Sequence, residues 1–232
     1  LGAKVALVER HLFGGDCLNV GCVPSKSLIR SARAAADIRQ ASRFGIAPRK
    51  ADGIDFDAVM MRMRRVRTRI SYHDSVRRFR DLGIDVFLGE AAFGGPDFVE
   101  VDGKKLLFKK AAITTGSRPV HPPIEGLAEA GYLTNETVFS LTALPQRMAI
   151  VGAGPIGCEF AQVFQRLGCA VTLIEVAPRI LNKEDADAAE VAVAALRNDG
   201  VDIRLKTSLK SVTALNGEKV LLLEENGGRT ES

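Results

Sequence analysis

The sequence contains no tryptophan, and only three histidines and four cysteines among its 232 residues. So few histidines leave little material for a metal centre, and four cysteines are too few for a disulfide scaffold. There is no run of about 18 apolar residues, the length that a membrane-spanning helix needs. The first residues also lack the basic region, apolar core and cleavage site of a secretion signal. We therefore expect a cytoplasmic protein that does not enter the membrane and holds no metal.

The composition is otherwise that of a globular protein, with 46% apolar and 26% charged residues. The net charge of +4 is uneven, because residues 62–80 contain eight arginines and a single acid, Asp74. A nucleic-acid-binding helix is one interpretation. However, no aromatic residue alternates with the arginines, and no nucleic-acid-binding motif accompanies them. We therefore favour a solvated helix face whose arginines pair with acids elsewhere, and expect no nucleic-acid partner.

Two segments of the chain share one pattern, LGAKVALVER at residues 1–10 and LGCAVTLIEV at residues 167–176. The second segment completes a strand–glycine turn–helix–strand unit that starts at Arg147. The first segment has no such unit before it, so we expect the sequence to begin inside a domain. It also ends abruptly, in a polar turn over residues 226–232.

Two stretches in the middle of the chain have helical patterns, residues 24–42 and 57–82. Residues 86–115 have the alternating pattern typical of an antiparallel ribbon, which leads into the strand-like AAITTG (111–116). Residues 117–126 form a proline-rich connector. We predict an α/β chain of two Rossmann-like nucleotide-binding domains, both incomplete, with the ribbon in the first. The first domain would span residues 1–145 and bind FAD, and the second would span residues 146–232 and bind NAD(P)H.

The motif GAGPIG at residues 152–157 follows a predicted strand and opens a predicted helix. Its first glycine makes the turn, the second lets the backbone approach a pyrophosphate, and the third lets the helix pack against the strand. The acid at Glu175 can accept from both ribose hydroxyls and would repel a 2′-phosphate, which favours NADH, although the nearby Arg179 favours NADPH. The predicted nucleotide-binding residues are Gly152, Gly154, Pro155, Ile156, Gly157 and Glu175.

Two of the four cysteines, Cys17 and Cys22, lie in GGDCLNVGCVPSK. A metal clip, a structural disulfide or a redox dithiol could use this pair. In a regular helix their α-carbons would lie about 8–9 Å apart, beyond the roughly 7 Å that a disulfide bridges. A disulfide therefore needs a distorted turn, for which Gly21 would supply flexibility, and so small a loop gains little chain entropy. The histidines lack ligand spacing. A reactive dithiol is favoured, with Cys22 near the free N–H groups of a helix start.

GGDCLNVGCVPSK resembles the redox-active segment of the flavoprotein pyridine nucleotide–disulfide oxidoreductases, and the resemblance covers essentially the whole chain. ALVE is similar to the strand whose acid holds the FAD ribose, GEAAF to an adenine contact, ITTGSRP to a second FAD contact, and GAGPIGCE to the nicotinamide-nucleotide motif. The resemblance implies FAD contacts from Glu9, Gly14, Gly15, Asp16, Lys26, Ala91, Thr115, Gly116 and Ser117. It departs at Asp16, where the family usually has threonine, and a carboxylate there should oppose thiolate formation at Cys17.

The resemblance also implies a relay in which NADH reduces the flavin and the flavin reduces the Cys17–Cys22 disulfide. Cys22 would be the flavin-proximal thiol, and Cys17 would be the interchange thiol that meets the substrate. Lys26 would lie near the flavin and pair with Glu159. The other two cysteines, at positions 158 and 169, match no redox position and are interpreted as packing residues.

The sequence lacks the family's first FAD glycine motif and its C-terminal interface domain, so we expect a homodimer only for the full-length protein and no turnover by these 232 residues alone. The substrate would be a small molecule, a metal ion or a dithiol. The resemblance is to the mercuric reductase and dihydrolipoamide dehydrogenase branches, and VPSK favours the former over the IPSK common in the latter. A non-catalytic redox sensor is a third hypothesis.

Overall fold

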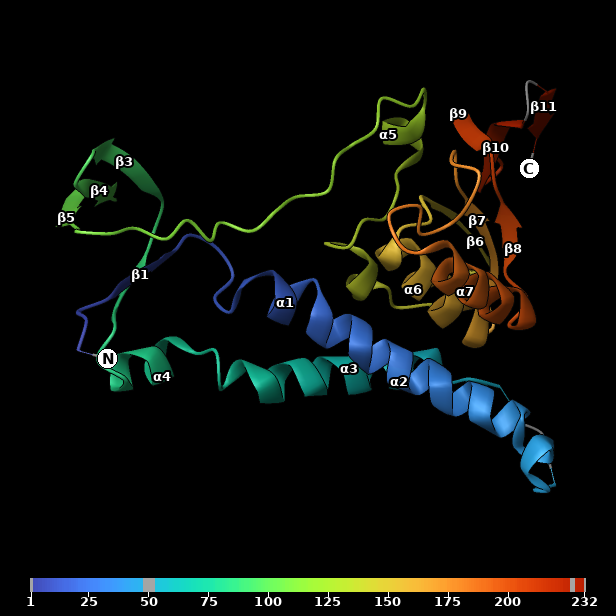
Figure 1. Cartoon of the computed structure of the whole chain (residues 1–232), viewed down its shortest axis with the longest axis horizontal. Coiled ribbons are helices and arrows are strands. Elements are labelled where there is room, and N and C mark those ends of the chain that lie inside the picture. The colour runs from blue at the N-terminus through green and yellow to red at the C-terminus, as the bar shows by residue number, and fades with distance from the viewer. Residues whose placement is uncertain (1, 48–52, 226–227, 232) are drawn as a thin grey trace. The chain divides into compact units, whose positions relative to one another are not determined.

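A computed structural model describes residues 2–47, 53–225 and 228–231 (Figure 1). The chain divides into two compact units, each built from two stretches of sequence. Unit 1 comprises residues 1–24 and 63–118, and unit 2 comprises residues 25–62 and 119–232. Among the described residues, no helix combines the length and the apolar character needed to cross a membrane.

Unit 1 contains two small sheets. Strands β1 (Ala6–Glu9) and β2 (Asp85–Leu88) pair in parallel. Strands β3 (Ala91–Gly95), β4 (Phe98–Val101) and β5 (Lys104–Leu107) form an antiparallel sheet in that order, which is the ribbon expected within residues 86–115. The expected strand at residues 111–116 is absent, because its backbone has no ladder partner among the described residues and stays exposed.

Helices form where the apolar spacing predicts them. Unit 1 holds α1 (Gly15–Asn19) and α4 (Val76–Asp81), while α2 (Cys22–Arg39) and α3 (Phe56–Ser71) each cross from one unit into the other. The helical stretch expected over residues 57–82 is therefore two helices, and α4 has its own N-cap, because the Ser75 hydroxyl accepts from the Arg78 N–H at 3.2 Å. Helix α3 buries one face through Phe56, Met60 and Met63.

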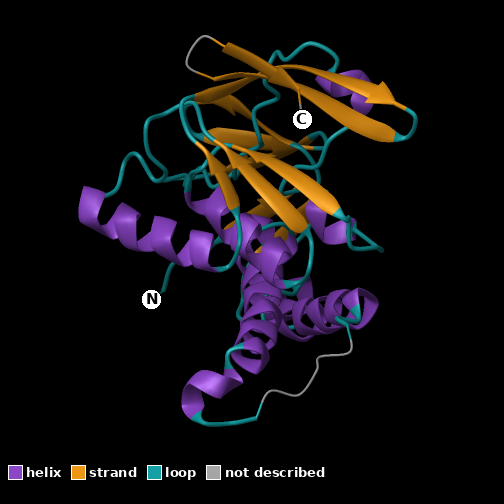
Figure 2. Cartoon of the chain, turned by 90° about the vertical axis from the view of Figure 1, so that its right-hand side faces the viewer, coloured by secondary structure: helices purple, strands orange, loops and turns teal. Residues whose placement is uncertain are grey.

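Unit 2 is built around a parallel sheet of β6 (Arg147–Val151), β7 (Ala170–Ile174) and β8 (Asp202–Arg204), in that order. Helices α6 (Pro155–Arg166) and α7 (Ala186–Asn198) make the two crossovers between these strands. The core includes Val171, Leu173 and Ile174 of β7, all buried. Phe164 of α6 and Leu167, the residue after that helix, are buried as well. Figure 2 draws the strands of this sheet in orange and the helices in purple.

A second sheet in unit 2 is antiparallel and follows the first in sequence. It orders β9 (Thr207–Leu215), β10 (Glu218–Glu225) and β11 (Gly228–Glu231) with β10 in the middle. Residues 228–231 thus form a strand where the sequence predicts a polar turn, and the rest of that turn lies outside the described residues.

Short helical segments complete the chain: η1 (Ala41–Phe44), α5 (Leu127–Ala130) and η2 (Val138–Ser140).

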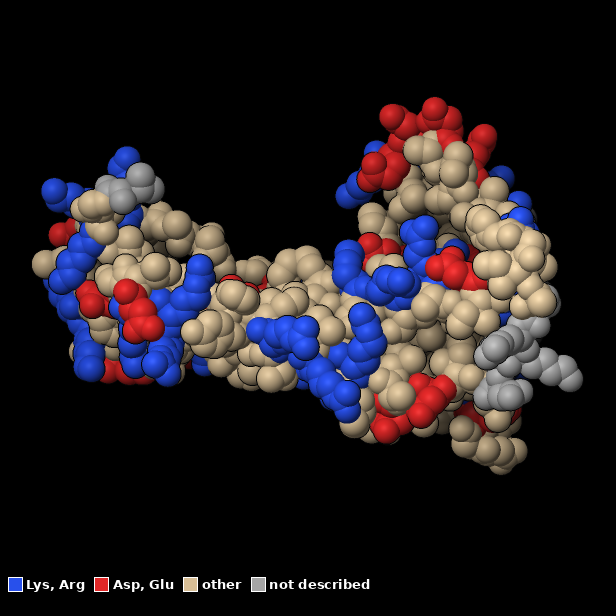
Figure 3. Space-filling view, turned by 90° about the horizontal axis from the view of Figure 1, so that it is seen from below, with Lys and Arg blue, Asp and Glu red and all other residues tan. Residues whose placement is uncertain are grey.

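The arginines of residues 62–80 bind carbonyl groups as well as acids. Arg62 donates to the Ser27 carbonyl at 3.0 Å, Arg67 to the Asn19 carbonyl at 3.4 Å and Arg78 to the His73 carbonyl at 2.7 Å. Arg77 lies 4.0 Å from Asp81. Lysine and arginine side chains gather in several exposed groups on the face drawn in Figure 3. The expectation that acids elsewhere would pair with these arginines is therefore corrected for Arg62, Arg67 and Arg78, which bind main-chain carbonyls and form no ion pair among the described residues.

Candidate functional site

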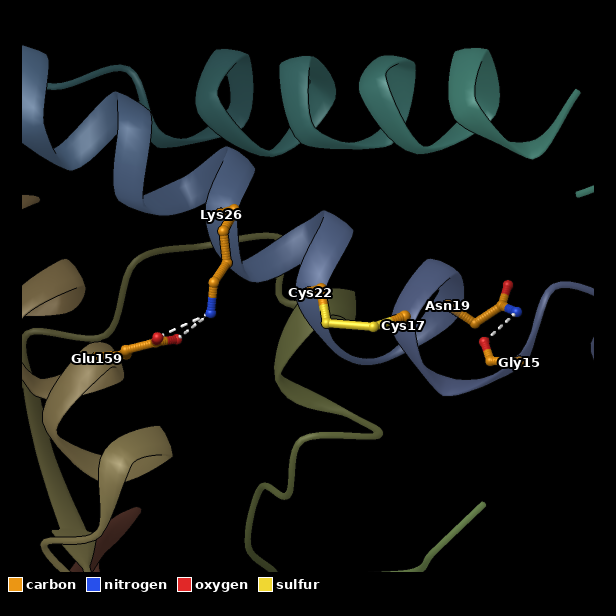
Figure 4. The surroundings of a disulfide bond; sticks show 6 residues. All are labelled: Gly15, Cys17, Asn19, Cys22, Lys26 and Glu159. Atoms are coloured by element: carbon orange, nitrogen blue, oxygen red, sulfur yellow. Dashed lines mark hydrogen bonds and ion pairs between the residues drawn. A yellow bond between two sulfur atoms is a disulfide. The ribbon is translucent and has the colours of Figure 1, made fainter. Parts of the chain in front are cut away.

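Cys17 and Cys22 form a disulfide, and their α-carbons lie 4.6 Å apart (Figure 4). This separation is much shorter than a regular helix allows, because the helix is interrupted between the two residues. Helix α1 ends at Asn19, and α2 begins at Cys22. Val20 leaves the helical conformation with φ −136°, while its N–H still donates to the Asp16 carbonyl at 2.9 Å. The distorted turn that the sequence requires is thus present.

Gly21 makes this turn possible through close packing. A Cβ atom built on Gly21 would lie 3.0 Å from the Asp16 carbonyl oxygen and 3.3 Å from the Cys17 α-carbon. Gly21 is not among the glycines with positive φ, so its backbone conformation is open to other residues. The expectation that Gly21 supplies flexibility is therefore corrected: its contribution is the missing side chain.

The loop before the disulfide is held by Asn19, which the sequence reasoning missed. The Asn19 side-chain amide donates to the Gly15 carbonyl at 2.9 Å and to the Phe13 carbonyl at 3.2 Å. Gly14 adopts φ 98° and would meet the Leu18 side chain if it carried a Cβ atom, whereas Gly15, at φ 68°, faces open space. An asparagine at this spacing from a Gly-Gly pair is a signal that could have been found, since its side chain competes for local backbone groups.

The predicted FAD contacts other than Lys26 lie in unit 1 and fall into two groups, whereas Lys26 lies in unit 2. In the first, the Asp16 carboxylate accepts from the Ser117 N–H at 3.1 Å, which joins the Gly14–Asp16 segment to the Thr115–Ser117 turn. Gly116 in that turn has φ +71°. In the second group, the Gly89 N–H donates to the Glu9 carbonyl at 3.0 Å. The predicted adenine contact, Ala91, is two residues beyond Gly89 in the chain.

The predicted nucleotide turn lies in unit 2, between β6 and α6. Gly157 packs against the Gly152 carbonyl so closely that a Cβ atom would collide with it, while Gly154 has open space on its Cβ side. Pro155 is the first residue of α6. No side chain of Gly154 caps the start of this 12-residue helix, and a helix start of this kind is a general anion-binding feature. The exposed Ile156, at 61%, offers an apolar contact beside it.

Glu175 connects the glycine turn to the loop after β7. One carboxylate oxygen accepts from the Ala153 N–H at 2.7 Å and the other from the Ala177 N–H at 2.9 Å. Each oxygen keeps a second lone pair for a ribose hydroxyl. Arg179 is engaged elsewhere, because its guanidinium donates to the Leu181 carbonyl at 3.3 Å and the Asn182 carbonyl at 2.9 Å.

The structure contains the ion pair between Lys26 and Glu159 that the resemblance implies. The Lys26 Nζ lies 2.7 Å and 2.8 Å from the two carboxylate oxygens (Figure 4). Both side chains are partly exposed, at 59% and 38%, so the pair contributes about 0–1 kcal/mol to stability. Its contribution is positional: it joins the first turns of α2 to α6, the helix that carries the nucleotide turn.

The two remaining cysteines have neutral thiols at physiological pH. Burial raises the pKa of Cys158 to about 11, assisted by the negative charge of Glu175, and burial raises the pKa of Cys169 to about 11. Cys169 is 1% exposed. Since the thiolate is the reactive form of cysteine, both residues are suited to packing. Among the described residues, no cluster of three or more metal-ligating side chains occurs.

Comparison with known proteins places these features in a family. A family profile described as pyridine nucleotide-disulphide oxidoreductase matches residues 1–231. The mercuric reductase of Bacillus cereus is 33% identical over 98% of this chain and 36% of its own length. The dihydrolipoyl dehydrogenase of Acholeplasma laidlawii is 34% identical over 91% of this chain and 64% of its own length. The chain thus spans between about one third and two thirds of these relatives.

Among solved structures, the HOCl-induced flavoprotein disulfide reductase RclA from Escherichia coli superposes with a TM-score of 0.79 and 29% sequence identity. The match covers 99% of this chain and 49% of that protein. The α/β fold predicted from the sequence is confirmed, and FAD and NAD(P)H are the cofactors of this group. Since the profile match extends over nearly every residue, this chain belongs to the pyridine nucleotide-disulphide oxidoreductase family.

Proposed function

We propose that the full-length protein takes two electrons from NADH, passes them through FAD to the Cys17–Cys22 disulfide, and delivers them to a substrate. The observation that carries this proposal is the disulfide itself. The disulfide connects two residues five positions apart, across the interruption between α1 and α2, and one of them is the first residue of the 18-residue helix α2. A disulfide that closes so small a ring contributes little to stability. Its place at a helix start suits a bond that opens and closes.

The two cysteines have different surroundings, which supports different roles. Cys22 is the first residue of α2, where the positive end of the helix dipole favours a thiolate. We assign it as the flavin-proximal thiol and Cys17 as the interchange thiol. FAD, when bound, supplies the two-electron transfer between nucleotide and dithiol. Uptake of two electrons and one proton by the disulfide leaves a thiol and a thiolate, and return of the electrons to substrate re-forms the bond.

The other site residues would bind and orient the cofactors. The backbones of Gly14, Gly15 and Gly116 would admit FAD, with Glu9 at its ribose, and the turn over residues 152–157 would hold the pyridine nucleotide with Glu175 at its ribose. This division retains residues 1–145 as the FAD-binding domain and residues 146–232 as the NAD(P)-binding domain. We further propose that the full-length protein is a cytoplasmic homodimer.

A mercuric reductase-like activity is the leading candidate, supported by VPSK and by the Bacillus cereus relative. A dihydrolipoamide dehydrogenase-like activity is the second candidate, supported by the Acholeplasma laidlawii relative. Both use the same dithiol, and they differ in whether the acceptor is a metal ion or a small disulfide.

Under anaerobic conditions, NADH should reduce one disulfide in the full-length protein and expose two new thiols, those of Cys17 and Cys22. Alkylation at pH 7 followed by peptide mass spectrometry should label these two and leave Cys158 and Cys169 unlabelled, since thiols with a pKa of about 11 are almost wholly protonated there. Labelling of the latter pair should rise only as pH approaches 11. An unchanged disulfide after NADH addition would refute the proposed relay.

The acceptor follows from steady-state assays of the same protein. NADH oxidation that depends on Hg(II) would establish the mercuric activity, and oxidation that depends on lipoamide would establish the dehydrogenase-like one. If NADH opened the disulfide but neither acceptor supported turnover, both named activities would be rejected in favour of a redox sensor.

Glu175→Ala should lower kcat/KM for NADH by roughly tenfold or more, because a hydrogen bond to a charged group is worth about 1.5–3 kcal/mol. The kcat/KM for NADPH should fall less, since the wild-type carboxylate repels a 2′-phosphate. Glu175→Gln removes the charge but keeps one oxygen that can accept from the Ala153 N–H. Comparing it with Glu175→Ala therefore distinguishes the effect of the lost charge from the effect of the lost hydrogen bond to Ala153. Arg179→Ala is the control and should leave NADH kinetics unchanged. A wild-type preference for NADPH would contradict the assignment.

A further inference from the structure

Asp16 brings a carboxylate into the segment that carries the redox pair. It lies in the first turn of α1 and immediately precedes Cys17. Its Oδ2 atom accepts from the Ser117 N–H at 3.1 Å, and a Cβ atom on Gly116 would contact the same carboxylate. The side chain therefore lies against the backbone of the Gly116–Ser117 turn, which fixes its direction.

The charge of this carboxylate is not balanced by a cation. Among residues 2–47, 53–225 and 228–231, the structure records a hydrogen bond from a neutral N–H to Asp16 and no ion pair with lysine or arginine. The lysine closest in sequence to the pair, Lys26, is engaged with Glu159. The one hydrogen bond recorded to the Asp16 carboxylate among these residues thus comes from a neutral donor.

Opening the disulfide changes the charge of the pair, and Asp16 opposes that change. The oxidised pair is neutral, whereas two electrons and one proton convert it into one thiol and one thiolate. A nearby carboxylate raises the free energy of the negatively charged product and leaves that of the disulfide almost unchanged. The effect is greatest at Cys17, the adjacent residue, and smaller at Cys22, where the start of α2 favours negative charge.

We propose that Asp16 makes the Cys17–Cys22 disulfide harder to reduce and directs the negative charge of the reduced pair to Cys22. The interchange thiol then stays uncharged until substrate arrives. This inference rests on the proposed function only in assuming that the disulfide opens and closes reversibly.

The test measures the reduction potential of the pair in the full-length FAD-bound protein. Protein is equilibrated with mixtures of reduced and oxidised dithiothreitol, quenched with an alkylating reagent, and scored by mass spectrometry of the peptide that carries both cysteines. Dithiothreitol supplies two electrons and becomes a cyclic disulfide while the protein disulfide becomes two thiols. Asp16→Asn removes the charge but keeps an oxygen that accepts from Ser117, and Asp16→Thr removes the charge and keeps a hydroxyl acceptor.

Both variants should shift the equilibrium constant toward the reduced pair by about tenfold, which is about 30 mV for a two-electron couple. In the reduced proteins, the rate of Cys17 alkylation relative to Cys22 at pH 7 should rise several-fold. The matched control is Asp37→Asn, an exposed acid on α2 that lies 15 residues beyond Cys22, roughly 22 Å along the helix. That distance exceeds the screening length, so this variant should behave as wild type.

Equal potentials in wild type, Asp16→Asn and Asp16→Thr would overturn the inference, as would a shift in which the uncharged variants become harder to reduce. Either result leaves the proposed function intact as long as the wild-type disulfide is reversibly reduced. If the wild-type pair cannot be reduced reversibly at all, the proposed function itself fails.

Discussion

Replacing either Cys17 or Cys22 by serine in the full-length protein is expected to reduce kcat for NADH-dependent turnover by on the order of 10³-fold or more. Each cysteine supplies one sulfur of the bond that carries the electron pair, and serine cannot form that bond. The double variant should be no worse than either single one, because residues that act as a unit lose their contribution together.

The other two cysteines supply the control for this result. Cys158→Ser and Cys169→Ala should retain kcat within about twofold, because both thiols have a raised pKa and neither has a role in the proposed relay. Turnover of the Cys17→Ser, Cys22→Ser double variant at the wild-type rate would show that electrons reach the substrate by a route that does not use the disulfide.

Asp199→Ala is expected to destabilise the packing of α6 against the end of α7 in unit 2 by about 3 kcal/mol. The Asp199 carboxylate accepts from Gln162 at 2.8 Å and from the Nε atom of Arg166 at 2.9 Å. The side chains of Arg166 and Asp199 are 19% and 6% exposed, so removing the carboxylate leaves a guanidinium largely out of water with no opposite charge.

Hydrogen exchange of the full-length protein, resolved by peptide, measures this effect where it occurs. Amides of α6 and α7 should exchange about 100-fold faster in Asp199→Ala, since local opening free energies set the exchange rate. Glu190→Ala, a change at an exposed position of α7, the helix that Asp199 follows, should leave exchange within about twofold. Equal protection in the two variants would show that packing alone holds α6 against α7.

Local patterns predicted the parts of the fold that depend on neighbours in sequence. The strand, glycine turn and helix from Arg147 to Arg166 follow from apolar periodicity and from the glycines at positions 152 and 157, and the structure has each of them. The Lys26–Glu159 pair, whose members are 133 residues apart, came instead from a family resemblance, because no periodicity connects positions so distant.

What the sequence did not predict depends on contacts that only a folded backbone defines. The Asp16–Ser117 hydrogen bond joins residues 101 positions apart, and the connection of Glu175 to Ala153 and Ala177 requires the loop geometry around β7. AAITTG has the composition of a strand, yet a strand also needs a hydrogen-bonding neighbour, and Ile113 is instead 71% exposed. Composition alone cannot supply that neighbour.

The turn between Cys17 and Cys22 also bears on how the proposed redox pair would behave over many cycles. The Val20 N–H donates to the Asp16 carbonyl, and this hydrogen bond involves no sulfur atom. The missing side chain of Gly21 leaves space for the same carbonyl. We expect the turn to stay formed when the disulfide is open, so that the two thiols keep a high effective concentration relative to each other. Closing the bond again should then require rotation of side chains and little movement of the helices.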